Sequence, residues 1–187
     1  ADYYIALRQR FEIARSAGAD VFVSLHADSS PFRASRGLSV YTLSTQASDE
    51  EAAALARREN RADVVAGVDI SRNGTRVAGI LIDLAQRQSL HNAHRLAATI
   101  VGALDGRVEM VPKPLRSAGF AVLKAPDVAS VLIEVGHLSN PKEEHQLRDP
   151  AYRARLAEGL LKGIDRYFTA KGKAPPARRG AEADAER

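Results

Sequence analysis

Two short apolar segments of the sequence end in residues whose types could do chemistry. The segment 130–135 (SVLIEV) contains a carboxylate, Glu134, near its carboxyl end, and the segment 21–25 (VFVSL) is followed by His26 and Asp28. A buried carboxylate is costly unless it is paired, protonated or close to a metal ion. If the two segments are neighbouring strands, an imidazole and a carboxylate converge on one cleft. That pair suits a zinc ion whose bound water gives a proton to the glutamate.

Simpler roles are open for both residues. Glu134 could reach solvent at the end of its strand, and His26 could serve only as a hydrogen-bonding group. His91 and His94 are spaced three apart on an expected helix, as metal ligands can be, but their polar neighbours favour a solvated face. An unrelated α/β metal hydrolase built on these two histidines is a further alternative. His137, three residues after Glu134, is expected to line the same cleft.

The elements that would position these residues follow from hydrophobic periodicity and from turn residues. Strands are expected over 21–25, 37–43, 119–125 and 130–135. Helices are expected over 2–17, 49–66, 80–104 and 150–168, with a short charged helix that starts at Asn140 and Pro141. The segment 111–116, which contains Pro112 and Pro114, is expected to be a connection. Since strands and helices alternate, the fold class is α/β, with a mostly parallel open sheet and helices on both faces.

Composition limits the function classes. A chain of 187 residues with 45% hydrophobic and 27% charged residues fits one globular domain, expected over 1–170. The absence of cysteine excludes disulfides and thiolate metal sites, so any metal must be held by histidine and carboxylates. A net charge of +4 and an aromatic content of 5% do not suggest nucleic-acid binding, and no apolar run is long enough for a membrane span. Residues 171–187 carry many charges and no large apolar side chain, so we expect a disordered tail.

Two long stretches and the closing helix resemble a known family. The stretches are 19–28 (ADVFVSLHAD) and 119–147 (GFAVLKAPDVASVLIEVGHLSNPKEEHQL). They are similar to the zinc-dependent N-acetylmuramoyl-L-alanine amidases that cut bacterial peptidoglycan, and more narrowly to the division-associated, AmiC-type branch. The resemblance implies an α/β fold, one catalytic zinc ion and a periplasmic location. The implied reaction is hydrolysis of the amide that joins N-acetylmuramic acid to L-alanine of the stem peptide, in cell-wall remodelling and daughter-cell separation.

The resemblance also implies roles for single residues. His26 in SLHAD matches a zinc ligand, and Glu134 in LIEVG matches the catalytic glutamate, which takes a proton from zinc-bound water and passes one to the leaving nitrogen. The family has two further zinc ligands ahead of the helix that opens this sequence. The amino-terminal strands that carry them are expected to be absent from this chain, which alone should bind zinc poorly and be inactive. They could lie on a separate chain. The alternative is a non-catalytic peptidoglycan-binding or regulatory module that keeps the amidase fold.

The segment 48–104 is expected to be a helical regulatory insertion, as in the AmiC-type branch. In that branch, a helix between the two similar stretches blocks the active site until a LytM-type activator protein removes it, and a glutamate of this helix can reach the zinc. Glu59 is the preferred candidate for that glutamate, with Glu51 second. The alternative is a solvated helix whose glutamates pair with neighbouring arginines.

Overall fold

One four-stranded sheet organises the computed structural model, which describes residues 3–30, 36–66 and 79–172. In their order across the sheet, the strands are β1 (Val21–His26), β4 (Ala129–Glu134), β2 (Leu38–Leu43) and β3 (Met110–Ala118). β1 pairs with β4 and β2 pairs with β3 in parallel, whereas β2 and β4 are antiparallel. The sheet is therefore mixed, and the antiparallel pairing is a feature that the sequence did not predict.

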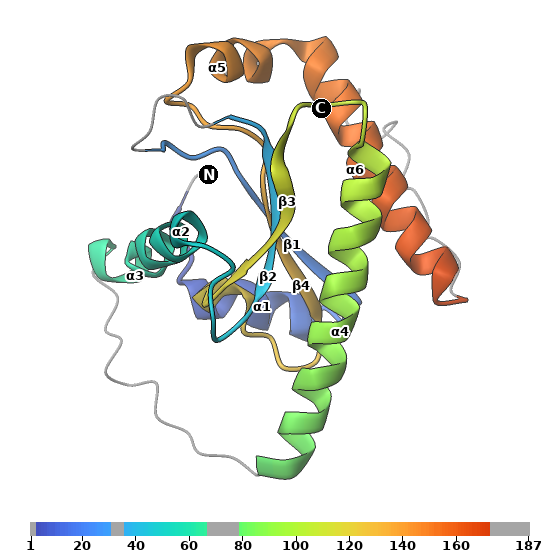
Figure 1. Cartoon of the computed structure of the whole chain (residues 1–187). Coiled ribbons are helices and arrows are strands. Elements are labelled where there is room, and N and C mark those ends of the chain that lie inside the picture. The colour runs from blue at the N-terminus through green and yellow to red at the C-terminus, as the bar shows by residue number, and fades with distance from the viewer. Residues whose placement is uncertain (1–2, 31–35, 67–78, 173–187) are drawn as a thin grey trace, which may run out of the picture.

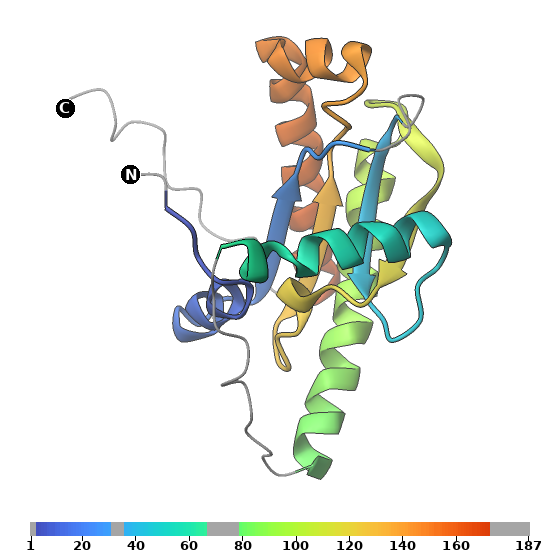
Figure 2. The same cartoon turned by 90° about the vertical axis from the view of Figure 1, so that its left-hand side faces the viewer.

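Helices cover both faces of this sheet. They are α1 (Leu7–Ser16), α2 (Glu50–Asn60), α3 (Ala62–Val65), α4 (Gly79–Leu104), α5 (Pro141–Arg148) and α6 (Pro150–Ala170). α4 and α6 lie against one face, whereas α1 and α2 lie on the other (Figures 1 and 2). The predicted α/β class is confirmed. Within the described part of the chain, none of the helices combines the length and the apolar character that crossing a membrane requires.

β4 is an interior strand, as its apolar run predicts. All of its residues are buried. Val131 and Ile133 pack in the cluster that α4 and α6 cover, whereas Leu132 packs with Tyr41 on the opposite face. Glu134 therefore ends a strand that is covered on both sides.

The prediction of a strand over 119–125 is wrong. Part of this segment, Ala121–Leu123, forms a short 3-10 helix that buries Val122 and Leu123 beside α1 and α2. The strand is instead β3, which contains the segment 111–116 that was expected to be a connection. β3 is at the edge of the sheet, because it pairs with β2 alone among the described strands. An edge position tolerates prolines, which have no N–H group to give to a neighbour.

Few apolar side chains hold α2 against the sheet. Its buried residues are Ala52, Leu55 and Ala56. The helix predicted over 49–66 is divided, because α2 ends at Asn60 and the short α3 follows. Val64 and Val65 of α3 are exposed, so they add nothing to the apolar contact. The attachment of α2 thus depends on polar contacts as much as on packing.

α6 approaches α4 closely at Gly163. A Cβ atom added there would lie 2.6 Å from the Cα atom of Ile100, so the backbone of one helix would have to move. We expect Gly163→Ala to lower the free energy of unfolding by about 1–3 kcal/mol. Urea denaturation followed by circular dichroism measures this change.

Gly102→Ala is the matched control, because Gly102 lies in α4 with nothing within 4 Å of an added Cβ. There the substitution should raise the free energy of unfolding by up to about 1 kcal/mol, since alanine favours a helix. Equal stabilities of the Gly163→Ala variant and the parent protein would contradict the close approach of the two helices.

Candidate metal centre and active site

The parallel pairing of β1 with β4 places His26 directly beside Glu134. Each is the last residue of its strand, and directly paired residues of neighbouring strands share a face of the sheet. Ser39 of β2 is paired with Glu134 from the other side. α2 lies across the strands on this face (Figure 2), and its Glu59 reaches His26 at the carboxyl end of β1.

Glu134 is a buried carboxylate with one oxygen held and one free. The backbone N–H of Asp28 donates a 2.8 Å hydrogen bond to Oε1 of Glu134. Oε2 has no hydrogen-bond partner among the residues that the structure describes. Burial, followed by the negative charge of Asp28, raises the pKa of Glu134 to about 9. Without a metal ion, the environment therefore favours a proton on this carboxyl group, whereas a cation bound beside it would favour the charged form that can accept a proton.

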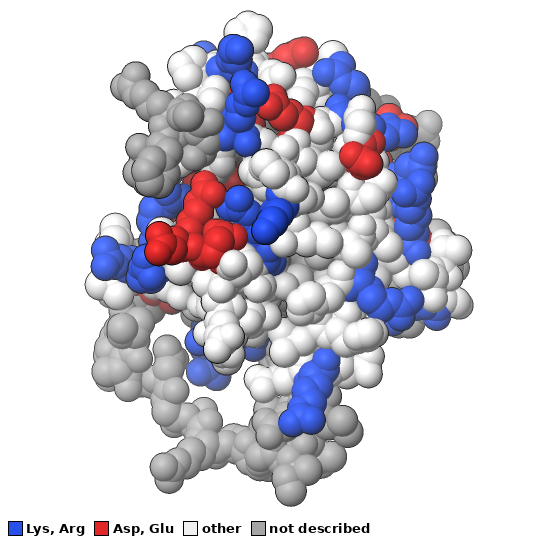
Figure 3. Space-filling view, viewed as in Figure 1, with Lys and Arg blue, Asp and Glu red and all other residues white. Residues whose placement is uncertain are grey.

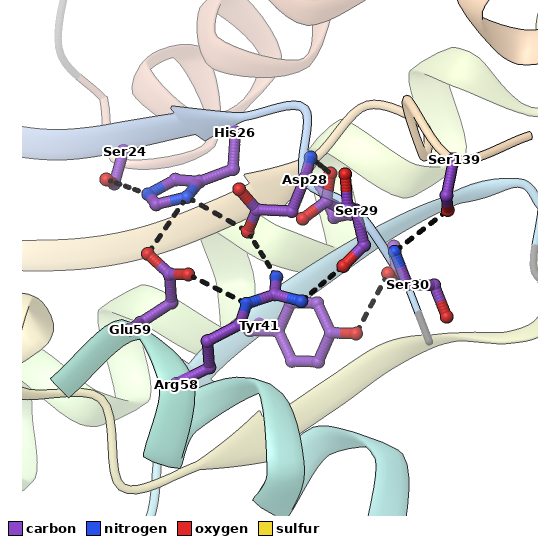
Figure 4. A network of polar contacts seen from close by, with 11 residues as sticks. Ser24, His26, Asp28, Ser29, Ser30, Tyr41, Arg58, Glu59 and Ser139 are labelled. Atoms are coloured by element: carbon purple, nitrogen blue, oxygen red, sulfur yellow. Dashed lines mark hydrogen bonds and ion pairs between the residues drawn. The ribbon is translucent and has the colours of Figure 1, made fainter. Parts of the chain in front are cut away.

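Three side chains that could hold a metal ion converge next to Glu134. They are His26, Asp28 and Glu59. His26 Nδ1 lies 3.4 Å from Asp28 Oδ2 and 3.4 Å from Glu59 Oε2 (Figure 4). In the described part of the chain, this is the one group of three or more such ligands. Ser24 Oγ lies 3.0 Å from His26 Nε2, and a hydrogen bond at Nε2 leaves Nδ1 to face the two carboxylates.

This donor set fits zinc. An imidazole nitrogen and carboxylate oxygens are usual ligands of catalytic zinc, at about 2.0–2.2 Å from the ion. Around a tetrahedral ion, such bonds put neighbouring ligand atoms about 3.4 Å apart. The two distances from His26 Nδ1 have this value. Because Glu59 belongs to α2, one of the three ligand side chains comes from a helix and not from the sheet.

Arg58 of α2 pairs with both carboxylates of the group. Its Nη2 lies 3.0 Å from Asp28 Oδ2 and its Nε lies 3.5 Å from Glu59 Oε1, while Nη1 donates to the backbone carbonyl of Ser29 (Figure 4). Burial raises the pKa of Asp28, but the hydrogen bond and charge of His26, together with Arg58, outweigh burial and lower it to about 2. Burial and the charge of Asp28 raise the pKa of Glu59. Asp28 is thus the more strongly ionised of the two.

Glu59, the preferred candidate on α2, is the glutamate that the structure brings to His26. Glu51 lies elsewhere on the helix, where its Oε2 accepts a 2.7 Å hydrogen bond from Nη1 of Arg116 on β3. Figure 3 shows acidic and basic side chains interleaved on the side of the molecule where α2 lies.

The other histidines lie outside the metal group. His91 is exposed. His94 has its Nδ1 2.8 Å from the carbonyl oxygen of Leu90 and its Nε2 3.3 Å from Thr42 Oγ1. Neither belongs to a group of metal-binding side chains among the described residues. The alternative hydrolase built on these two histidines therefore has no support in the structure.

A cavity of about 750 Å³ lies between α2 and the loops that follow β1 and β4. Its lining includes Ser30, Tyr41, Glu51, Arg57 and His137. His137 is buried, and its Nδ1 has no hydrogen-bond partner within residues 3–30, 36–66 and 79–172. His137 thus lines a cavity that Arg58 and Ser29 also line, next to the metal group, and this cavity leaves room for a ligand.

Sequence reasoning missed two members of the site. Asp28 was noticed at the end of its strand but received no role, although a carboxylate two residues after a candidate histidine ligand was a usable signal. Arg58 had no such signal. Its contact with Asp28 depends on how α2 docks on the sheet, which hydrophobic periodicity does not reveal.

Residues 1–166 match the family described as N-acetylmuramoyl-L-alanine amidase. The chain belongs to this family. This family member is 37% identical over 168 residues to the N-acetylmuramoyl-L-alanine amidase AmiA of Escherichia coli K12. It is 38% identical over 169 residues to the amidase AmiC of Neisseria meningitidis serogroup B. Each similarity covers 89% of this chain, but only 58% of AmiA and 40% of AmiC, so the chain spans less than two thirds of either relative.

Solved amidases share the fold of this family member. The catalytic domain of CwlV, an N-acetylmuramoyl-L-alanine amidase from Bacillus (Paenibacillus) polymyxa var. colistinus, is 25% identical with a TM-score of 0.53, over 90% of this chain and 68% of that domain. The CwlD amidase of Clostridioides difficile, solved in complex with the GerS lipoprotein, is 20% identical with a TM-score of 0.58. That similarity covers 88% of this chain and 62% of CwlD.

Proposed function

We propose that residues 1–170 form part of the catalytic domain of a zinc-dependent peptidoglycan hydrolase. It would cleave the amide between N-acetylmuramic acid and L-alanine of the stem peptide, in cell-wall remodelling and daughter-cell separation in the periplasm. The observation that carries the proposal is Glu134, whose Oε2 has no partner among the described residues, beside a donor set that fits zinc. Membership of the amidase family supports the type of bond.

Glu134 moves the proton in this mechanism. The N–H of Asp28 holds Oε1 and so fixes the plane of the carboxyl group. Oε2 is then the atom that takes a proton from the attacking water and passes it to the leaving nitrogen of L-alanine. His26 would hold the zinc ion, and Glu59 would be a further ligand while α2 is in place. When bound, zinc polarises the carbonyl group of the scissile amide.

Further zinc ligands are proposed to come from a segment that pairs with β1. A catalytic zinc ion takes about three protein ligands. Of the group described above, Asp28 is paired with Arg58 and Glu59 would leave with α2, so only His26 would remain as a ligand in the open protein. Among the described strands, β1 pairs with β4 alone, and Leu25 of β1 is 59% exposed. An open edge with apolar side chains can receive another strand. That strand would belong to another part of the protein or to a separate chain, and residues 1–187 alone should then bind zinc poorly and be inactive.

The proposed regulatory element is α2, within the segment 48–104. Glu59 Oε2 occupies a ligand position beside His26, so a substrate oxygen that approaches the zinc ion must compete with it. The polar attachment of α2 suits a helix that an activator protein displaces, and the proposed activator is of the LytM type. CwlD of Clostridioides difficile, an amidase of the same fold, forms a complex with the GerS lipoprotein, which supports a protein partner of some kind.

Digestion of purified peptidoglycan by the zinc-loaded full-length protein tests the proposed function. Mass spectrometry should find stem peptides with a free amino group on L-alanine and muramic acid with a free lactyl carboxyl group. The alternative is a non-catalytic peptidoglycan-binding or regulatory module. Retention of the protein on peptidoglycan without either product, with α2 removed from the site by an activator, would favour that alternative.

The proposed displacement of α2 predicts that Asn60→Ala raises basal activity. Asn60 Nδ2 donates a 2.9 Å hydrogen bond to the carbonyl of Gly119, and Oδ1 accepts a 2.7 Å hydrogen bond from the N–H of Ala121. Each bond contributes about 1 kcal/mol, so losing both should increase the fraction of open protein and the initial rate about thirtyfold. The rate is measured on labelled peptidoglycan without an activator.

Asn92→Ala is the control, because Asn92 lies on α4 on the opposite face of the sheet, where it accepts a 3.3 Å hydrogen bond from Gln88. Its basal rate should equal that of the parent protein. An unchanged rate for Asn60→Ala would mean that α2 does not limit access to the site.

A further inference from the structure

Arg116 of β3 is a nearly buried cation that α2 covers. Its side chain is 12% exposed, and Nη1 donates a 2.7 Å hydrogen bond to Glu51 Oε2. A second carboxylate oxygen, Oδ2 of Asp49, lies 3.8 Å from its Nε. Asp49 caps the first turn of α2 and Glu51 belongs to that turn. The two carboxylates that pair with Arg116 therefore leave with α2 if α2 is displaced.

The strand register places Arg116 on the face of the sheet that carries the active site. Tyr41 is paired with Arg116 on one side and with Leu132 on the other. Leu132 is two residues before Glu134, so its side chain lies on the same face as that of Glu134. Arg116, Tyr41 and Glu134 consequently lie on one surface, and α2 covers that surface (Figure 2).

We propose that Arg116 binds a free carboxylate in the peptide half of the substrate, and that Glu51 occupies this position while α2 is in place. The proposal rests on the proposed amidase function and adds a substrate-binding residue to it. Glu51 would thus act as an internal substitute for the substrate carboxylate. Displacement of α2 would remove the substitute and uncover the binding site in one step.

The chemistry of the substrate explains why the ligand is on the peptide side. The lactyl carboxyl group of muramic acid is consumed in the scissile amide, so free carboxylates of a muramyl peptide belong to its amino acids. An arginine binds a carboxylate through two parallel N–H donors, which gives both affinity and orientation. Once α2 has left, a substrate carboxylate can take the place of Glu51 beside Arg116.

The spacing of the strands agrees with this assignment. From His26 to Arg116 the sheet crosses three strand spacings and advances two residues, which is about 16 Å between Cα atoms. An extended peptide advances about 3.4 Å per residue. Two or three residues of the stem peptide advance about 7–10 Å, and the long side chains of Arg116 and of the substrate would span the rest. We therefore place the matching carboxylate on the second or third residue.

The cavity beside α2 provides the path between the two points. It is lined by Glu51 and Tyr41 at the Arg116 side and by Ser29 and Arg58 at the metal group. Figure 4 shows Tyr41 beneath the loop that carries Ser29 and Ser30. His137, whose buried Nδ1 has no hydrogen-bond partner among the described residues, is also in the lining.

Two roles of Arg116, holding α2 in place and binding substrate, predict opposite effects of its removal on activity. If Arg116 only fastens α2, its removal should raise basal activity, as removal of Glu51 would. If Arg116 also binds substrate, its removal should lower the activity of the open enzyme, and only on substrates that carry the carboxylate. The sign of the change and its dependence on substrate separate the two roles.

The test uses the full-length, zinc-loaded protein carrying Asn60→Ala, and two synthetic N-acetylmuramyl tripeptides. One has free carboxylates on its second and third residues, and the other has carboxamides. Adding Arg116→Gln should lower kcat/KM for the tripeptide with free carboxylates (the acid tripeptide) about 10- to 100-fold, mostly by raising KM. For the tripeptide with carboxamides (the carboxamide tripeptide), kcat/KM should change less than twofold. Arg116→Lys, which keeps the charge, should lie between. Lys113→Gln is the control, because Lys113 is an exposed cation of the same strand.

Binding without turnover provides a second readout. In the inactive Glu134→Gln variant, calorimetry should show that adding Arg116→Gln weakens binding of the acid tripeptide and leaves binding of the carboxamide tripeptide unchanged. An equal loss on both tripeptides, or a higher basal rate with an unchanged ratio of acid to carboxamide, would overturn the proposal. If the enzyme with intact Arg116 cleaves neither tripeptide nor peptidoglycan, the amidase function itself fails.

Discussion

Glu134→Gln should lower kcat for amide cleavage about 10²- to 10⁴-fold while leaving the fold and the metal content intact. Glutamine has nearly the same shape, and its oxygen can still accept the hydrogen bond that the Asp28 N–H donates. It cannot carry the proton between the attacking water and the leaving nitrogen. Because Glu134 is fully buried, a neutral side chain there adds no desolvation cost. Initial rates on peptidoglycan and zinc content by elemental analysis measure the two outcomes.

Glu144→Gln is the matched control for this substitution. Glu144 lies on α5 and pairs with the exposed Arg148, four residues later in the same helix. An exposed pair of this kind contributes little to stability, so activity and unfolding should both stay at the parent level. If Glu134→Gln retains more than about a tenth of the parent rate, another group moves the proton.

His26→Ala should remove zinc and activity together. Mutation of a residue that only hydrogen-bonds a zinc ligand typically lowers metal affinity about 10- to 100-fold. Loss of the ligand itself should lower the affinity by more than that. The expected result in the full-length protein is a zinc content well below one equivalent and no detectable release of stem peptides. Chelation of the parent protein should abolish activity in the same way, and added zinc should restore it.

His91→Ala is the control for the loss of a histidine. His91 is exposed on α4 and outside the metal group, so its variant should retain zinc and activity. Retention of one zinc equivalent by His26→Ala would show that other residues hold the metal. Loss of zinc from His91→Ala would revive the alternative site on α4.

The part of the site that lies on the strands could be predicted from the sequence. A single carboxylate in the apolar run of β4 and a histidine at the end of β1 are visible as exceptions to local patterns. Parallel strands bring such exceptions together at one edge of the sheet. The register confirms the expectation, since His26 is paired with Glu134.

The remainder depends on tertiary packing that local patterns do not encode. Arg58 and Arg116 look like ordinary surface arginines until α2 docks on the sheet and brings carboxylates to them. β3 was missed because its prolines argue against a strand unless the strand lies at an edge. The apolar segment after it was taken for that strand, since a buried 3-10 helix and a buried strand have similar composition.

The tight contact of α6 with α4 at Gly163 separates the stability of the domain from the stability of α2. Amides of α4 near Ile100 and of α6 should exchange hydrogen only near the free energy of global unfolding, because that core must open as a unit. Amides of α2, which is held by Leu55 and a few polar contacts, should exchange through a local opening of lower free energy. The proposed activator would therefore have to supply only the free energy of that local opening, while the sheet that aligns His26 with Glu134 would keep its shape.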